Sequence, residues 1–178
     1  MICTKTDLKK YLNIEKRIYF KNKKDYIIKK MSNNEKYYIW KFQKHLRLAE
    51  YHYNKGRTIN KLIYCYHINR KNKIGNQLGI FICINTVEEG LAIYHSGEIV
   101  VSGMSKCGKN LKLHGNNCIG NKGKDGERPI IGDNCDMGFG AVIIGNVKIG
   151  NDVKVGANAV VNKSFEGGIL VGVPAVRK

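Results

Sequence analysis

A six-residue period in the second half of the chain constrains the fold more than any other feature. Aliphatic or sulfur-containing residues recur at every sixth position: Val101, Cys107, Leu113 and Ile119, then Ile131, Met137, Ile143, Ile149, Val155 and Val161. A glycine directly follows six of them. A fixed short period is typical of a solenoid, in which each rung buries its face against its neighbours. A period of six fits neither a helix nor a hairpin meander, so it predicts short parallel strands joined by tight turns.

One interruption of the period predicts a loop. Ile119 and Ile131 are twelve residues apart, so the segment GNKGKDGERP stands where a single turn is expected. Long excursions from a repeat scaffold usually carry function. The charged side chains of this loop are Lys122, Lys124, Asp125, Glu127 and Arg128.

The first half of the chain has a different pattern, which divides the protein into residues 1–75 and 76–178. It contains no proline, and its two glycines, Gly56 and Gly75, each follow a segment with helical spacing. We expect one helix with a buried face of Ile39, Phe42, Leu46 and Ala49, an N-cap among residues 32–34 and an end at Gly56. A second helix is expected from Thr58, with Ile59, Leu62, Ile63 and Tyr66 on its apolar face. Residues 1–30 are also expected to be helical.

The positive charge is concentrated in the helical half. Residues 1–75 hold 20 Lys and Arg against 5 Asp and Glu, whereas residues 76–178 hold 11 against 9. Such a segment attracts nucleic acid, an anionic membrane surface, an acidic glycan or a phosphorylated cofactor, or it is simply a solvated helical surface. Trp40 and the tyrosines either stack on nucleobases or pack in the core.

Composition points to the cytoplasm. No run of eighteen apolar residues indicates a transmembrane helix, and the N-terminal segment lacks the apolar core of a secretory signal. The six cysteines show no zinc-type spacing, so we expect free thiols in a reducing compartment. Contact with the inner face of the membrane remains an open expectation for the basic half.

The hexads themselves resemble a known family. The runs IIGDNC, MGFGAV, IIGNVKIG and DVKVGANAVV, closed by ILVGVPAVRK, resemble the hexapeptide-repeat acyltransferases over residues 79–178. The likeness is to serine acetyltransferases and to the shorter acetyltransferases of capsule and O-antigen gene clusters. It implies a left-handed parallel β-helix after a basic helical domain. It also implies a homotrimer, with acetyl-CoA and acceptor meeting between neighbouring prisms, and helices able to join two trimers.

The resemblance assigns the catalytic role to His95. This residue stands six before Val101, in phase with the buried positions, so on spacing alone it is either a core histidine or a functional one. Serine acetyltransferases place their catalytic histidine where YHSGEIVV places His95. A neutral imidazole can take the proton of an attacking hydroxyl. We expect direct transfer without an acyl-enzyme, because Cys107 and Cys118 have no adjacent base.

The resemblance also assigns binding residues, and His114 is a second catalytic candidate. Cofactor contacts are expected at Gly120, Asn121, Phe139, Ala157, Asn162, Lys163 and Arg177. Substrate contacts are expected at Tyr94, Glu127 and Arg128. A cation such as Lys163 or Arg177 suits the phosphates of acetyl-CoA, and no metal is expected.

Departures from the family pattern favour a sugar over serine as acceptor. The family's acidic partner of the catalytic histidine matches Ile80 or Phe81 here, which leaves Glu88 or Glu89 to orient His95. Tyr94 stands where the family has an acidic residue, and Glu127-Arg128-Pro129 where it has Arg-His-Pro. We therefore expect an O-acetyltransferase acting on a surface-polysaccharide sugar or its precursor, with serine O-acetylation as the alternative.

Two other classes remain as alternatives. A γ-type carbonic anhydrase needs three imidazoles on zinc, and the repeat half holds only His95 and His114. A nucleic-acid-binding protein built on residues 1–75 is compatible with the charge, although no recognition motif is present.

Overall fold

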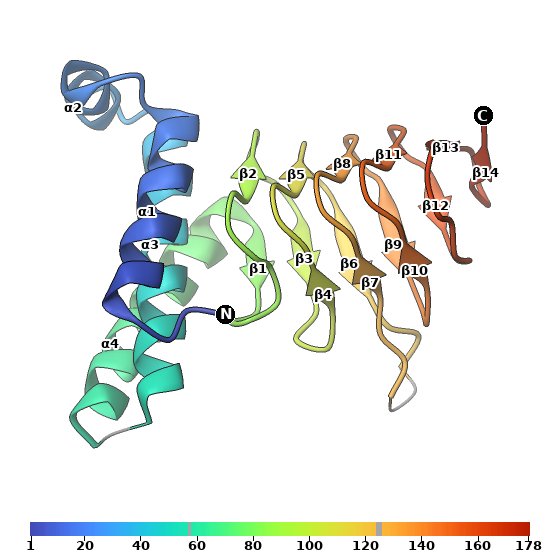
Figure 1. The fold of residues 1–178 in the computed structure, drawn as a ribbon. Helices are drawn as coiled ribbons and strands as arrows, with labels where there is room; N and C mark the ends of the chain where they lie inside the picture. Colours follow the sequence, from blue (N-terminus) through green and yellow to red (C-terminus); the bar gives the residue numbers. More distant parts are fainter. Residues whose placement is uncertain (57, 124–125) are drawn as a thin grey trace. The chain divides into compact units, whose positions relative to one another are not determined.

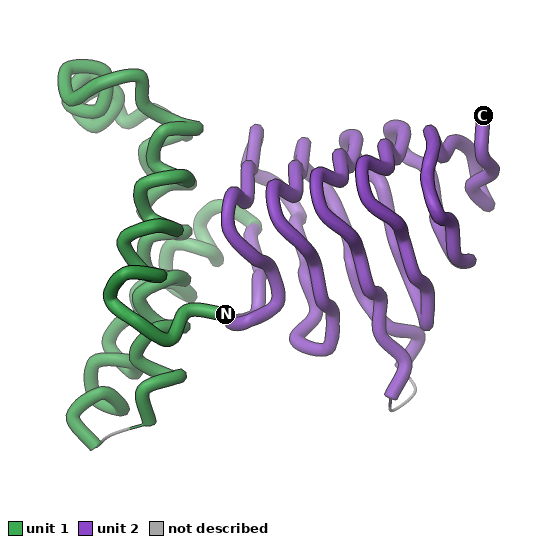
Figure 2. The backbone as a smooth tube through the Cα atoms, in the orientation of Figure 1, with its two compact units in different colours: residues 1–79 green, residues 80–178 purple. Residues whose placement is uncertain are grey.

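The chain forms two compact units, 1–79 and 80–178 (Figure 2). The computed structural model describes residues 1–56, 58–123 and 126–178. The first unit is helical, and the second consists of short strands (Figure 1). The units divide four residues beyond the boundary expected from Gly75, because the last helix continues through this buried glycine to Leu78.

Four helices make up the first unit, and local caps fix their ends. They are α1 (Lys5–Tyr19), α2 (Lys23–Met31), α3 (Glu35–Lys55) and α4 (Thr58–Leu78). Thr4 and Asp7 form a reciprocal capping box at the start of α1, with bonds of 3.0 and 2.8 Å. Asn34 caps α3, and Gly56 ends it with φ 66°, as predicted. Within the described part of the chain, no helix has both the length and the apolar content needed to cross a bilayer.

The apolar face of α3 is buried, whereas that of α4 is exposed. Ile39, Phe42, Leu46 and Ala49 of α3 are fully buried, and Trp40 packs in the same core. On α4, by contrast, Ile59, Leu62 and Tyr66 are exposed. They therefore leave an uncovered apolar surface on the first turns of α4.

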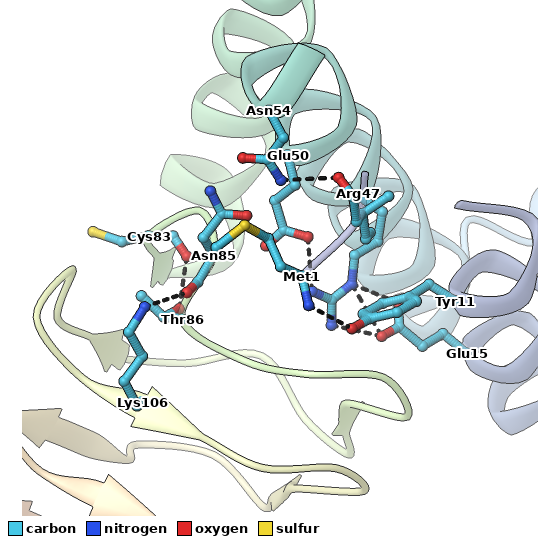
Figure 3. A network of polar contacts seen from close by, with 11 residues as sticks. Met1, Tyr11, Glu15, Arg47, Glu50, Asn54, Cys83, Asn85, Thr86 and Lys106 are labelled. Carbon is cyan, nitrogen blue, oxygen red and sulfur yellow. Dashed lines mark hydrogen bonds and ion pairs between the residues drawn. The ribbon is translucent and has the colours of Figure 1, made fainter. Parts of the chain in front are cut away.

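A buried ion network holds α1 and α3 together (Figure 3). The Arg47 guanidinium is fully buried; its Nη2 lies 2.6 Å from Glu15 Oε1, and its Nη1 lies 2.9 Å from Glu50 Oε2. It also stands over the Tyr11 ring, 5.0 Å from the centroid. Burial alone would lower the pKa of Arg47, but the two carboxylates outweigh it and raise that pKa. Arg47 and the two carboxylates therefore compensate one another's charge in the buried site.

Replacing Arg47 with Met should destabilise the helical unit by about 3–5 kcal/mol, because Glu15 and Glu50 would remain buried without a counter-charge. Lys44→Met, at an exposed position of the same helix, should change the free energy of unfolding by less than about 0.5 kcal/mol. Urea unfolding followed by circular dichroism measures both. Equal effects of the two substitutions would contradict the role given to the network.

A histidine pair links α3 to α4. The Nδ1 atoms of His45 and His67 lie 2.9 Å apart, and the His52 ring stacks on His67 with centroids 5.9 Å apart. Burial and the neighbouring His67 lower the pKa of His45 from 6.5 to about 4. The pKa of His67 is also lowered, by burial and by His52. The folded state therefore favours neutral imidazoles.

This pair predicts an acid-sensitive helical unit. The unfolded chain protonates His45 as the pH falls below 6.5, whereas the folded chain resists protonation until about pH 4. Stability present above pH 6.5 should thus be lost between these two values. His45→Gln should flatten that part of the profile, measured by urea unfolding at stepped pH. Parallel profiles for parent and variant across this range would show that the pair does not titrate as expected.

The second unit is a parallel β-helix whose coils visit three sheets in turn (Figure 1). The five-stranded sheet has the order β1-β3-β6-β9-β12, the three-stranded sheet β10-β7-β4, and the six-stranded sheet β14-β13-β11-β8-β5-β2. The strands are β1 (Ile80–Ile82), β2 (Ala92–Ile93), β3 (Ile99–Val101), β4 (Lys106–Cys107), β5 (Lys112–Leu113), β6 (Cys118–Gly120), β7 (Ile130–Ile131), β8 (Asp136–Met137), β9 (Val142–Ile144), β10 (Lys148–Ile149), β11 (Lys154–Val155), β12 (Val160–Val161), β13 (Ile169–Val171) and β14 (Val176–Arg177). All pairings are parallel except that of β13 with β14.

The hexad residues stack in register and form the core of the β-helix. Val101 lies beside Ile119, Ile119 beside Ile143, and Ile143 beside Val161, and all four are fully buried. Three hexads therefore make one coil. Residues 121–123 and 126–129 belong to the loop between β6 and β7, which is six residues longer than a single turn of the repeat. Two residues of this loop, Lys124 and Asp125, lie outside the described residues.

Candidate active site

Both predicted catalytic histidines lie where the six-stranded sheet turns into the five-stranded sheet. We call this edge the His corner; it consists of residues 94–98, 114–117, 138–141 and 156–159. Five predicted site residues lie on it in successive coils: Tyr94, His95, His114, Phe139 and Ala157. Residues far apart in sequence are thus brought to one edge by the stacking of coils.

His95 is exposed in the first turn of this corner and is not a core residue. Ile93, not His95, pairs with Leu113 of the next coil, and it is the buried residue of its hexad. Eight residues therefore separate Ile93 from Val101, whereas six separate Leu113 from Ile119. The expectation that His95 shares the phase of the buried residues is wrong, because the two surplus residues are accommodated in the turn. This surplus is what presents the imidazole to solvent.

A polar network adjoins His95 on the six-stranded sheet. The Tyr94 and His114 rings lie 4.7 Å apart between centroids, tilted by 44°. His114 Nε2 lies 2.8 Å from Asp136 Oδ1, and Lys112 Nζ lies 3.8 Å from Asp136 Oδ2. The carboxylate of Asp136 therefore fixes the orientation of the His114 ring.

Asp136 is a residue that sequence analysis missed. It stands just before the buried Met137, in the same phase as Lys112 before Leu113, and it pairs with Lys112 in the adjacent strand. The twelve-residue interruption hides this relationship, because it places the two strands 24 residues apart. Counting the loop in the coil length gives the 24-residue offset that places Asp136 beside Lys112, two residues before His114.

Gly115 lies in the His corner at a position where a side chain would meet the Phe139 ring. Its φ is +121°, and a Cβ built there would lie 3.0 Å from the Phe139 ring and 3.5 Å from the Ser96 carbonyl oxygen. The Phe139 side chain itself is 49% exposed. The missing side chain thus lets an exposed aromatic ring lie close to the turn that carries His95.

Gly115→Ala should lower the free energy of unfolding by about 1–3 kcal/mol, because alanine rarely adopts this φ and its methyl group would press on Phe139. Gly167→Ala provides the matched control, since its Cβ would meet no described atom within 4 Å and its φ is not in the left-handed region. We expect that control to change stability by less than about 0.5 kcal/mol. Thermal unfolding compares them; a smaller loss at Gly115 than at Gly167 would refute the packing argument.

The remaining predicted residues lie elsewhere. Gly120, Asn121, Glu127, Arg128, Asn162 and Lys163 lie where the chain leaves the five-stranded sheet, an edge we call the loop corner. Asn121 Nδ2 donates to Met104 Sδ at 3.3 Å, and Glu127 is half-buried beside the exposed Arg128. Arg177 is exposed on β14 of the six-stranded sheet. A single chain therefore does not bring the predicted cofactor residues together.

Glu88 and Glu89 do not lie beside His95. Asn110 N donates to the Glu89 carbonyl oxygen, and Lys109 Nζ lies 3.9 Å from the Glu89 carboxylate. These contacts place both glutamates at the third corner, before β2, whereas His95 follows β2. The idea that either carboxylate orients His95 is therefore not supported by their position.

The thiols of Cys107 and Cys118 are unsuited to nucleophilic attack. Burial raises the pKa of Cys107 to about 12 and also raises the pKa of Cys118. Among the described residues, no three His, Cys, Asp or Glu side chains are grouped as metal ligands.

Serine acetyltransferases are among the known proteins that this chain resembles in sequence. The serine acetyltransferase of Mycobacterium tuberculosis (strain ATCC 25618 / H37Rv) is 34% identical over 85 residues, covering 46% of this chain and 37% of its own. That of Staphylococcus aureus (strain Mu50 / ATCC 700699) is 37% identical over 87 residues, covering 47% and 41%. The chain thus spans about two fifths of the length of these curated relatives. A search of family models gave no match.

Solved structures match over nearly the whole chain. The soybean serine acetyltransferase complexed with serine matches with a TM-score of 0.77 at 24% identity, covering 96% of this chain and 69% of that one. The Neisseria gonorrhoeae enzyme matches with a TM-score of 0.69 at 25% identity, covering 96% and 65%. The fold is therefore a left-handed parallel β-helix preceded by helices, and the chain resembles the hexapeptide-repeat acyltransferases. Within that class, it is serine acetyltransferase-like.

Proposed function

We propose that this protein is an acetyl-CoA-dependent O-acetyltransferase and that L-serine is its acceptor. The observation that carries the proposal is the exposed His95 at a corner that also holds a second, carboxylate-bound imidazole. The relatives support serine more than the polysaccharide sugar expected from sequence, since they are serine acetyltransferases. Similar solved structures include a serine acetyltransferase from Brucella abortus strain S19 in complex with coenzyme A and one from N. gonorrhoeae in complex with serine.

His95 acts as general base in this proposal. Its neutral imidazole takes the proton of the acceptor hydroxyl as the oxygen attacks the thioester carbonyl carbon. The tetrahedral intermediate then collapses, the carbon–sulfur bond breaks, and the imidazolium returns its proton to the CoA sulfur. The buried, high-pKa Cys107 favours this direct route over a covalent acetyl-thiol intermediate.

His114 and Tyr94 serve the acceptor side. The bond from His114 Nε2 to Asp136 leaves Nδ1 as the other polar atom of the ring, so a fixed imidazole faces the space near Tyr94. Such a group can position an amino or hydroxyl group of the acceptor for attack. Asp136 is then a positioning residue that acts through His114.

The loop corner supplies the cofactor side. Lys163 is an exposed cation, and Asn121 and Asn162 offer amide groups near the same edge. Cations and hydrogen-bond donors suit the phosphates and pantetheine amides of CoA. Phe139 and Ala157, at the His corner, provide surface for its acyl end.

A homotrimer would unite the two corners. They lie at opposite edges of the five-stranded sheet, whose outward side chains form an apolar ladder of Phe81, Val100, Cys118, Val142 and Val160. Phe81 is 52% and Val100 40% exposed, which is unusual for a stable monomer surface. Burying this ladder against a second copy would set the His corner of one chain beside the loop corner of the next. The exposed face of α4 is a candidate for joining two trimers.

The sugar acceptor remains the second candidate, because Tyr94 and Glu127 stand where the serine acetyltransferases carry other residues. We place the protein in the cytoplasm, where its free thiols persist. An assay of CoA release with L-serine, UDP-sugars and oligosaccharide repeats distinguishes the acceptors. Activity with a sugar but not with serine would overturn the serine proposal and leave the acetyltransferase proposal intact.

His95→Gln should lower kcat by about 10²- to 10⁴-fold while leaving CoA binding nearly unchanged, because it removes the base and keeps the shape of the turn. His52→Gln, in the helical unit, is the matched imidazole control and should retain activity. Steady-state kinetics with acetyl-CoA and isothermal titration with CoA give the two readouts. If His114→Gln abolishes turnover while His95→Gln does not, the base is His114.

A further inference from the structure

The outward face of α2 is apolar, which is the reverse of an ordinary surface helix. Ile27, Ile28 and Met31 are 44%, 54% and 79% exposed, and no residue of α2 is buried. Their spacing of one, three and four residues places them on one side of the helix. A helix that turns its large aliphatic side chains to water needs a partner for them.

Contacts on the other side of α2 fix this orientation. The Tyr26 ring packs edge-on against Phe20 and Tyr37, with centroids 5.0 and 5.7 Å away. Lys29 Nζ lies 2.8 Å from Asp25 Oδ2 and donates to the Tyr19 carbonyl oxygen at 2.8 Å. Rotating α2 to hide its aliphatic face would break these contacts, so the face stays exposed.

The surroundings of this face are strongly positive. Residues 16–31 hold seven Lys and Arg against one Asp, and Asp25 is already paired with Lys29. Lys23, Lys24 and Lys30 are exposed around the aliphatic face. Lys16, Arg17, Lys21 and Lys23 also line a pocket of about 460 Å³, which lies on the Tyr26 side of α2 and not on its aliphatic face.

We propose that the α1–α2 corner, residues 16–31, docks on an anionic phospholipid bilayer. Helices that lie in the membrane interface carry aliphatic side chains flanked by lysines. The aliphatic side chains insert below the headgroups, and the lysines lie among the lipid phosphates. The aliphatic face of α2 enters the acyl boundary, and the surrounding cations bind the anionic headgroups. The docking site consists of residues of the helical unit and includes no residue of either corner of the β-helix.

The positive charge and the aliphatic side chains of this face argue against two other partners, a second copy of the chain and single-stranded nucleic acid. A second copy would bring like charges together at this face, whereas the exposed face of α4 lies in a stretch, residues 58–69, with a single Lys and no acidic residue. That face suits self-association. Single-stranded nucleic acid would need exposed rings for stacking, but Tyr26 is engaged and the exposed side chains are aliphatic.

Flotation of the full chain with vesicles tests the proposal. The vesicles are phosphatidylcholine alone or an equal mixture with phosphatidylglycerol, and the protein should float only with the mixture. Replacing Lys23, Lys24 and Lys30 by Gln should weaken binding by about 100-fold, since each lysine near an anionic surface contributes about fivefold. Replacing Ile27, Ile28 and Met31 by Ser should weaken it at least tenfold, and more visibly at high salt, where charge attraction is screened.

The matched control removes three charges from the other unit: Lys148, Lys154 and Lys178, all exposed, are replaced by Gln. It should bind like the parent, and circular dichroism should show all variants folded. Absence of flotation, or equal loss in the control, overturns the proposal. So does a change of oligomeric state in the Ser variant by sedimentation, which assigns the face to a second copy. The proposal also fails if the parent binds single-stranded DNA more tightly than vesicles and the Ser variant keeps that DNA binding. This result would assign the surface to nucleic acid.

Discussion

The structure depends on the stacking of one buried aliphatic side chain on its counterpart in the next coil. Each strand of the β-helix is only two or three residues long, so no coil is stable alone. The columns through Ile119 and Ile143, or Leu113 and Met137, fix the register of every strand. Any surplus residue must therefore leave the coil at a corner, because within a strand it would turn the aliphatic residue out of the core.

This constraint explains where the chemistry lies. Two surplus residues after Ile93 open the turn that exposes His95, and a six-residue surplus after Ile119 opens the loop of the opposite corner. The buried thiols in the stack are held protonated by their surroundings, whereas the imidazoles and carboxylates lie outside it. The side chains inside the β-helix are thus unreactive, and the imidazoles and carboxylates lie at its corners.

Much of the fold can be predicted from the sequence, because the hexad period and the helical spacing of apolar residues in α3 indicate which side chains are buried. The site follows only in part. The six-residue count places His95 in the core column, and only the pairing of Ile93 with Leu113 reveals the shift. Asp136 was missed because its partner His114 is 22 residues away. On α4, helical spacing identified an apolar face, but spacing does not say whether another element covers it.

We propose that the active site is assembled at a seam between copies along the five-stranded sheet. The most direct test mixes two inactive variants, His95→Ala at the His corner and Asn121→Trp at the loop corner. A mixed trimer would contain one seam in which both corners are intact, so the account predicts that activity returns when the chains are unfolded and refolded together. Mixed trimers that form, as seen by native mass spectrometry, and yet remain inactive would contradict it.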